Sequence, residues 1–152
     1  MTDVRIRDME PGEAETVLAL VMRVFDELVR PDFTEAGIAE FTRTARSVVM
    51  DQPQGHEALV AESDGRVVGM IDVRDGSHIS LFFVDADCRG RGVGRALVEE
   101  VARRIPEAPT RQTTVNSSPW AVPVYERLGF VGTAPLQEKD GIRYMPMAKV
   151  LG

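Results

Sequence analysis

The sequence has little cysteine, few aromatic residues and no long apolar run. Its 152 residues include a single cysteine, Cys88, which excludes an intramolecular disulfide and a zinc site built from several cysteines. Because disulfides persist mainly in oxidising compartments, we expect a cytoplasmic protein. No stretch of about 18 apolar residues is present, so we expect no membrane span. The first seven residues lack the apolar core of a secretory signal, which fits the same expectation.

Positive charge is also in deficit. The chain has 24 Asp and Glu residues against 18 Lys and Arg residues, so its formal net charge is -6. This balance argues against a broad nucleic-acid-binding surface. With 43% apolar and 28% charged residues the composition is that of an ordinary soluble protein. The length suits one compact domain, and we expect a single domain over residues 1–152.

The first third of the chain is mostly helical in pattern. Residues 4–7 alternate apolar and charged side chains, which predicts a half-exposed strand. Apolar residues then recur at i, i+3 and i+4 from Pro11 to about residue 30, which predicts a helix that Pro31 ends or kinks. Thr34 is a suitable N-cap for a second helix.

Three Asp-Gly pairs mark hairpin turns, because the tightest hairpin turns need positive φ at both central residues. They lie at residues 64–65, 75–76 and 140–141. The first two separate strand patterns at 58–62, 67–73 and 79–84, which predicts an antiparallel meander. The third separates a weak strand over 131–138 from a strand over 142–150, in which Pro146 predicts an edge position or a bulge.

The segment between these strands predicts helix, strand and helix. Apolar spacing indicates a helix over residues 93–105, and residues 111–116 are strand-like. A last helix would begin with Ser118 as N-cap and Pro119 at its first position, and end at Gly129. We therefore expect an α/β fold with a mixed, mostly antiparallel sheet of about seven strands and about four helices.

A glycine- and arginine-rich loop joins the strand over 79–84 to the helix that follows it. Glycines at alternate positions let a ligand approach the backbone, and the helix start offers unpaired N–H groups and a positive dipole end. The three arginines add positive charge, so the loop suits a phosphorylated ligand. The alternative is a tight turn with incidental arginines. The segment consists of Arg89, Gly90, Arg91, Gly92, Val93, Gly94 and Arg95.

Two common phosphate motifs fit this loop poorly. The ATP-binding loop requires a lysine after its last glycine, and no lysine is present here. The dinucleotide-binding fingerprint, started at Gly90, would need glycine or alanine where Arg95 stands.

Two motifs carry a resemblance to a known family. Arg89-x-x-Gly92-x-Gly94 resembles the Gln/Arg-x-x-Gly-x-Gly/Ala signature of the GNAT superfamily of N-acetyltransferases. Downstream, Asn116 followed by Tyr125-Glu-Arg-Leu-Gly-Phe130 is similar to the second half of that family's cofactor site. The resemblance extends over residues 1–150 and implies the GNAT fold.

The resemblance implies acetyl-CoA as co-substrate and no metal. The pyrophosphate would bind the amides from Arg89 to Arg95. The pantetheine arm would lie between two splayed strands, 79–84 and 111–116, and pair with the backbone of Phe83 and Val84. Asn116 matches a family position whose amide contacts that arm; alternatively, it caps a strand end.

The family's general acid matches Tyr125, whose phenol would donate to the departing CoA thiolate. The alternative is a half-buried tyrosine that anchors its helix. An amine such as lysine, with a pKa of ~10.4, must lose a proton before attack. Some relatives carry a glutamate for this on the strand equivalent to 79–84, but that strand has no carboxylate here. Asp72 and His78 are the candidate bases; the alternative is that both are surface residues and that water takes the proton.

The acceptor would lie beneath the segment that joins the first two helices. Glu27, with its neighbours Asp26 and Asp32, would attract a cationic amine, while Phe25 and Phe33 would form a wall. The alternative for these residues is a solvated helix end with two core aromatics. For Cys88, His56 and Trp120 the sequence favours structural roles.

The sequence thus predicts direct acetyl transfer to a primary amine of a small molecule or peptide. A non-catalytic acyl-CoA sensor is the alternative, and the missing strand carboxylate motivates it. A tRNA-directed acetylating enzyme would want a basic surface, which the net charge of -6 disfavours. A homodimer is possible, because homodimers are common in the family.

Overall fold

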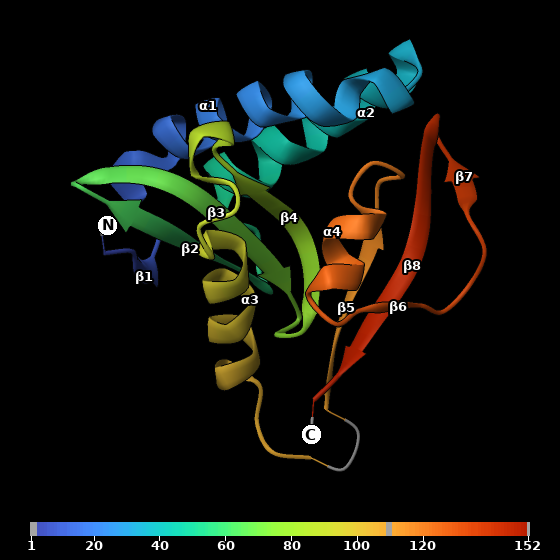
Figure 1. The fold of residues 1–152 in the computed structure, drawn as a ribbon. Helices are drawn as coiled ribbons and strands as arrows, with labels where there is room; N and C mark the ends of the chain where they lie inside the picture. The colour runs from blue at the N-terminus through green and yellow to red at the C-terminus, as the bar shows by residue number, and fades with distance from the viewer. Residues whose placement is uncertain (1–2, 109–110, 152) are drawn as a thin grey trace.

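The computed structural model describes residues 3–108 and 111–151 and shows a twisted sheet between two pairs of helices (Figure 1). The strand order is β1-β2-β3-β4-β5-β8-β6, and β7 pairs with β8. All neighbours are antiparallel except β4 and β5, which are parallel. The strands are β1 (Arg5–Asp8), β2 (His56–Ser63), β3 (Arg66–Arg74), β4 (His78–Val84), β5 (Gln112–Ser117), β6 (Val131–Gly132), β7 (Gln137–Lys139) and β8 (Ile142–Val150).

The four α-helices cover the two faces of the sheet and enclose two apolar clusters. Helices α1 (Ala14–Val24) and α2 (Glu35–Arg46) pack on one face, and α3 (Val93–Arg104) and α4 (Val122–Arg127) lie on the other (Figure 1). Within the described residues no helix is both long and apolar enough to cross a membrane.

The predicted mixed, mostly antiparallel sheet with four helices is confirmed, with eight strands in place of about seven. The extra strand arises where the sequence predicts one weak strand over 131–138. Pro135 lies between β6 and β7 there, and proline lacks the N–H that a continuous strand would use.

The two N-terminal helices begin and end where local signals place them. A 3-10 turn over Pro11–Glu13 leads into α1, and the helical path then continues through a π-helical turn, Phe25–Val29, and a 3-10 turn, Arg30–Asp32. Thr34 caps α2 as predicted, since its Oγ1 accepts a hydrogen bond from the Gly37 amide at 3.0 Å.

The predicted start of the last helix is wrong. Ser118 Oγ accepts from the Ala121 amide at 3.3 Å, but this closes only a turn, and α4 begins at Val122. Pro123 decides the difference, because it lies in the first turn of α4, where a missing N–H costs no intrahelical bond. A start at Pro119 would have placed Pro123 in the helix interior.

The predicted edge position of Pro146 holds locally, because β8 has a strand partner on one side only at this residue. The short strands β6 and β7 pair with β8 on either side of Pro146 but do not reach it. Pro146 lies opposite Asn116 of β5, and its carbonyl accepts from Thr133 at 2.8 Å on the other side. The N and O of one strand residue point to the same side, so the missing N–H takes no bond from the pairing with β5.

The parallel pair of strands separates almost as soon as it forms. Only His78 pairs with Thr114 and Ile79 with Val115, and beyond them β4 and β5 share no register. The β5-facing backbone groups of the rest of β4 therefore have no strand partner, and buried backbone groups need one. The sheet is thus open at its centre.

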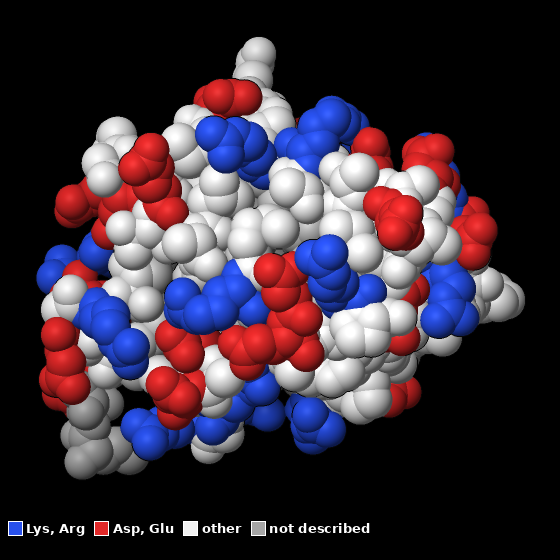
Figure 2. All heavy atoms as spheres, turned by 90° about the horizontal axis from the view of Figure 1, so that it is seen from above, with Lys and Arg blue, Asp and Glu red and all other residues white. Residues whose placement is uncertain are grey.

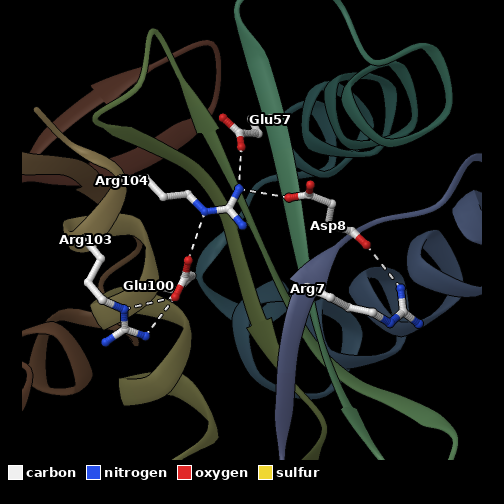
Figure 3. A network of polar contacts seen from close by, with 6 residues as sticks. All are labelled: Arg7, Asp8, Glu57, Glu100, Arg103 and Arg104. Carbon is white, nitrogen blue, oxygen red and sulfur yellow. Dashed lines mark hydrogen bonds and ion pairs between the residues drawn. The ribbon is translucent and has the colours of Figure 1, made fainter.

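Charged side chains join the C-terminal end of helix α3 to strands β1 and β2 (Figure 3). Arg104 donates to Asp8 of β1 at 2.8 Å and to Glu57 of β2 at 2.6 Å, and to Glu100 one helical turn back at 3.0 Å. Partly exposed ion pairs contribute modestly one at a time, but one guanidinium shared by three carboxylates fixes the position of the helix end.

The N-terminus of α2 meets the β7–β8 hairpin across the open centre. Thr34 Oγ1 donates to the Gly141 carbonyl at 3.2 Å, and a Cβ added to Gly37 would lie 2.3 Å from that same oxygen. Glycine at position 37 therefore permits this contact, which closes one end of the opening.

Replacing Gly37 with alanine should force the helix and the hairpin apart. We expect Gly37→Ala to lower the free energy of unfolding by about 1–3 kcal/mol, the usual cost of overpacking, as measured by urea denaturation. Gly12→Ala is the matched control, because a Cβ there meets nothing within 4 Å. Equal stabilities for the two variants would show that the contact does not constrain the fold.

Candidate active site

The open centre of the sheet holds a cleft of about 580 Å³. Its walls come from β4, the loop before α3, the end of β5, α4, the α1–α2 segment and the β7–β8 hairpin. Of the residues predicted for the site, the following line it: Phe33, Phe83, Val84, Arg89, Gly90, Gly92, Val93, Gly94, Arg95, Asn116 and Tyr125.

One end of the cleft is the loop between β4 and α3. Asp85 holds the start of this loop, since its carboxylate accepts from the Asp87 amide at 3.2 Å and from Arg23 of α1 at 3.0 Å. Gly90 and Gly92 have φ of +80° and +81°, a conformation that other residues adopt at a cost. The chain can therefore turn sharply from the strand into the helix.

The amides at the start of α3 are available to a ligand. Gly92 is the N-cap and has no side chain to occupy them, and the first bond along the helix runs from the Ala96 amide to the Gly92 carbonyl. Gly94 serves a different purpose, because a Cβ there would lie 3.0 Å from the Phe82 ring. It allows α3 to pack against β4.

Basic side chains gather around the same cleft. Arg89, Arg95, Arg127 and Arg143 line it, and Arg95 reaches across to donate to the Arg127 carbonyl at 3.3 Å. Across the described ranges 3–108 and 111–151, no Asp, Glu or His lines this cleft. The outer face over α1 and α2 has both signs of charge interspersed (Figure 2). The residues that line the cleft therefore carry a net positive charge, although the protein as a whole is acidic.

Arg91 is the one predicted loop arginine outside this cleft. It lines a second cavity, of about 450 Å³. The other lining residues include Cys88, Val93, Val4 just before β1, and Val68 of β3. Arg91 belongs to the predicted loop, but it is exposed and does not line the cleft.

Tyr125 lies on α4. Its ring packs in the core, and the residue also lines the wall of the cleft. It is 5% exposed and packs against Phe82 and Phe130, with ring centroids 5.7 and 5.3 Å away. Burial raises the pKa of the Tyr125 phenol well above its usual range. The hydroxyl therefore stays protonated and can donate a hydrogen bond at any physiological pH.

An aromatic cluster closes the other end of the cleft. Phe25 stacks on Phe41 with 4.0 Å between centroids, Phe33 packs edge-on to both, and Phe41 meets Phe83 of β4 at 5.9 Å. Phe33 and Phe41 line the cleft, whereas Phe25 is fully buried behind them. The predicted wall is therefore present, with Phe25 as its support.

The structure does not bring the predicted bases into the cleft. Asp72 is fully buried and its Oδ2 lies 2.6 Å from His56 Nδ1, on the β3–β2 pair. His78 lies at the closed end of the β4–β5 pair, 2.8 Å from Thr114 Oγ1, and burial lowers its pKa. His56, which has no obvious partner in the sequence, is thus the partner of Asp72.

The carboxylates predicted to attract a cationic amine also lie outside the cleft. Asp26 and Glu27 are exposed, and Asp26 pairs with Arg30 at 3.0 Å. Asp32 faces Arg143 of the hairpin, with 3.9 Å between the charged atoms. None of the three carboxylates lines the cleft.

Several cleft residues escaped the sequence analysis. Phe41 carried only a helix-face signal, although its aromatic character was visible. Ile142, Arg143 and Tyr144 line the cleft from the β7–β8 hairpin, which the sequence predicts but cannot place beside α2. A group of three or more His, Cys, Asp or Glu residues suited to a metal ion does not occur in the described part of the chain.

The arrangement suits a long ligand with an anionic end and an apolar arm. Free helix amides and arginines are available for the anion. The unpaired edge of β4 offers backbone groups along the arm, and Tyr125 lies at the wall beyond them. Such a site can hold a phosphorylated thioester and donate a hydrogen bond to a leaving group.

Comparison with known proteins agrees with this reading. The sequence model of the family described as "Acetyltransferase (GNAT) domain" matches residues 29–151. The chain is 32% identical to the peptidyl-lysine N-acetyltransferase YjaB of Escherichia coli, over 90% of this chain and 88% of the relative. It is 28% identical to the S-alkylcysteine N-acetyltransferase of Bacillus subtilis, over 99% of this chain and 91% of that protein.

Solved structures share the fold. The crystal structure of the PaiA N-acetyltransferase of Thermoplasma acidophilum, determined in complex with coenzyme A, superposes with a TM-score of 0.73 at 14% identity. The match covers 98% of this chain and 99% of that one. At this identity the likeness concerns the fold alone.

The buried Asp72 makes a prediction about stability. Burial raises its pKa from about 3.8 to about 6, so the folded state holds the proton at pH values where the unfolded state has lost it. The contribution of Asp72 to the free energy of unfolding should therefore fall as pH rises from 4 to 7. Asp72→Asn removes this fall, and its stability relative to the parent should grow by about 1–3 kcal/mol over that range.

Urea denaturation at pH 4, 5, 6 and 7 measures this difference. Asp75→Asn, the same change at an exposed aspartate whose side chain is 79% accessible, is the control and should run parallel to the parent. Parallel curves for Asp72→Asn as well would mean that Asp72 ionises freely in the folded protein.

Proposed function

The chain belongs to the GNAT family of acetyltransferases, and from that premise we propose that it transfers the acetyl group of acetyl-CoA directly to a primary amine, with Tyr125 as hydrogen-bond donor to the leaving sulfur. The observation that carries the proposal is the cleft between β4 and β5. It joins the free amides of α3 to the side chain of Tyr125.

The phosphate end of acetyl-CoA would bind the loop before α3. The amides of Val93, Gly94 and Arg95 are the first of the helix, and anions bind such amides because of the helix dipole. Arg89 and Arg95 line the same end and add charge-assisted contacts. Because the chain as a whole is acidic, we expect a phosphorylated ligand to bind at this local group of positive charges and not elsewhere on the surface.

The pantetheine arm would follow the opening between the strands. Val84 would offer backbone groups on the free edge of β4 to its amides, and Asn116 would add a side-chain amide from β5. Apolar side chains around them exclude water, which strengthens each of these hydrogen bonds. The backbone of Phe83 faces β3 instead, because the Asp85 amide, two residues on, donates to Val68 of β3 at 2.8 Å.

Acetyl-CoA supplies a thioester, an activated acyl group. The amine nitrogen attacks the thioester carbonyl carbon, a C–N bond forms, and the C–S bond breaks. Tyr125 donates its hydroxyl hydrogen toward the sulfur as negative charge develops there, which lowers the energy of the transition state. As the amide forms, the nitrogen loses one proton and the CoA sulfur gains one, which leaves the Tyr125 hydroxyl restored; no acyl-enzyme forms. An acceptor that begins as an ammonium ion must first lose a further proton.

No side chain of the described cleft is suited to take that proton. Its ionisable residues are arginines, tyrosines and Cys88, and no Asp, Glu or His among the described residues lines it. The cationic walls act on the acceptor instead, because nearby positive charges disfavour an ammonium ion and lower its pKa. Water reaching the cleft then carries the proton away.

Removing the Tyr125 hydroxyl should separate binding from turnover. We expect Tyr125→Phe to bind acetyl-CoA within about threefold of the parent in calorimetry and to lose roughly 10²- to 10³-fold in kcat, as loss of one transition-state donor does. Free CoA release over a panel of primary amines measures the turnover.

The other tyrosine of the cleft gives the matched comparison. Tyr144 donates its hydroxyl to Gln137 on the hairpin at 3.2 Å, so Tyr144→Phe should reduce kcat far less. Acetyl-CoA binding without product from any amine would instead favour an acyl-CoA sensor. Absence of acetyl-CoA binding to the parent would refute the proposed function.

The lack of a base predicts a simple pH profile. The value of kcat/KM should rise tenfold per pH unit up to the pKa of the free amine and then stay level, and kcat should level off at the pKa of the bound amine, because burial keeps Tyr125 protonated beyond that range. Steady-state rates from pH 6 to 10 with two acceptors of different amine pKa test this. A break near pH 6 that does not move with the acceptor would reveal an enzyme base.

A further inference from the structure

We propose that the acceptor is a small amine that carries a carboxylate and an apolar side chain, as a free apolar amino acid does, and that Arg143 binds its carboxylate. The inference rests on the proposed function and assigns the acceptor end of the same cleft. It starts from the signs of the charges that face the cleft.

Every charged residue that lines the cleft, within the described part of the chain, is an arginine. A polyamine or a lysine-rich peptide would bring further positive charge with no carboxylate to receive it, and like charges at short range repel. An acceptor with its own negative charge compensates the arginines. The charge pattern therefore favours an amine that is not cationic overall.

The four arginines do not serve the same end. Arg89 and Arg95 flank the start of α3, where the phosphates would lie, and the Arg127 carbonyl receives the Arg95 guanidinium. Arg143 lies on β8 instead, and its guanidinium faces Asp32 of the segment between α1 and α2. It is the cleft arginine left for an acceptor.

The donors of Arg143 are largely unused. Its Nη2 is 3.9 Å from the Asp32 carboxylate, which is too far for a hydrogen bond, and its side chain is 46% exposed. A guanidinium presents five N–H groups in a plane that matches a carboxylate with two parallel bonds. A ligand carboxylate would therefore bind the donors that point away from Asp32, with the guanidinium charge between the two carboxylates offsetting their repulsion.

Apolar side chains surround this end of the cleft. Leu28 and Phe33 come from the α1–α2 segment and Phe41 from α2. They offer no hydrogen bond to a polar substituent, and burying an unpaired polar group is costly. An acceptor with an aliphatic, thioether or aromatic side chain fits both the apolar wall and Arg143.

A peptide lysine is the competing acceptor, because the E. coli relative is a peptidyl-lysine N-acetyltransferase. A lysine side chain carries no carboxylate near its amine, so Arg143 would have nothing to bind. The name of the B. subtilis relative, an S-alkylcysteine N-acetyltransferase, describes the chemistry inferred here: an amine, a carboxylate and an apolar thioether.

The experiment compares acids with their amides. Leucine, methionine, phenylalanine and S-methylcysteine are assayed with acetyl-CoA beside the amide of each, and beside a lysine peptide with a blocked N-terminus. Each rate is divided by the fraction of the acceptor whose amine is neutral at the assay pH, because the amine of an amino-acid amide has a different pKa from that of the free amino acid. We expect kcat/KM for at least one acid to exceed that of its amide by tenfold or more.

Variants of Arg143 assign the preference to one side chain. Arg143→Gln should raise the KM of the preferred acid roughly 10- to 100-fold, as loss of a charged hydrogen-bond partner does, and leave its amide within about twofold. Arg143→Lys should restore part of the loss, because it keeps the charge and loses the planar fork. Arg103→Gln, at an exposed arginine of α3 paired with Glu100, is the control.

Binding supplies a readout that needs no turnover. Calorimetric titration of the same amino acids into the protein, with and without CoA, should give binding to the parent and at least tenfold weaker binding to Arg143→Gln. Thermal melts confirm that the variants fold, and the half-exposed position of Arg143 makes a stability loss small.

The outcomes separate the two proposals. Preference for the lysine peptide, an equal loss for acid and amide in Arg143→Gln, or no binding of any of the amino acids would overturn this inference while acetyl transfer stands. Failure of the parent protein to bind acetyl-CoA, or to acetylate any amine, would overturn the proposed function, and the amino-acid titrations would still judge Arg143.

Discussion

The early separation of β4 from β5 is the constraint on which the site depends. Two parallel pairs, His78 with Thr114 and Ile79 with Val115, hold the strands together at one end only. Beyond them a sheet that would otherwise be continuous gives up its hydrogen bonds at the centre. A fold can tolerate this loss because each strand keeps a full antiparallel partner on its other side, β3 for β4 and β8 for β5. The gap thus exposes backbone groups without loosening the strands that frame it.

Local signals predicted most of the fold and one half of the cleft. Thr34, the Asp-Gly turns and the loop glycines act within a few residues, so their geometry can be read from the chain. The start of α4 was missed because a good cap at Ser118 competes with the position of Pro123, and proline decides. Asp72 was placed at the surface because nothing local shows that His56 lies across β2 and β3 from it. Arg143 was missed for the same reason, since its neighbours belong to a segment about a hundred residues earlier.

The cleft also shows how little a net charge says about a site. The protein carries an excess of acidic groups, but many of them pair with arginines on the outside, and the buried Asp72 pairs with His56 away from the cleft. The walls of the cleft carry the opposite sign. An enzyme without an acid or imidazole in its cleft can still favour the neutral, nucleophilic amine, because a positive field destabilises the ammonium form.

The contact between α2 and the β7–β8 hairpin has a bearing on folding. Thr34 and Gly141 are 107 residues apart, and their hydrogen bond closes the acceptor end of the cleft. Contacts between such distant segments require most of the chain to be ordered first, because closing a long loop costs entropy that nearer contacts have not yet repaid. The acceptor end is therefore the last part of the cleft to be completed and the first to open in a local fluctuation. Selection can alter it with little effect on the folding nucleus, which lets acceptor preference change while the donor end stays the same.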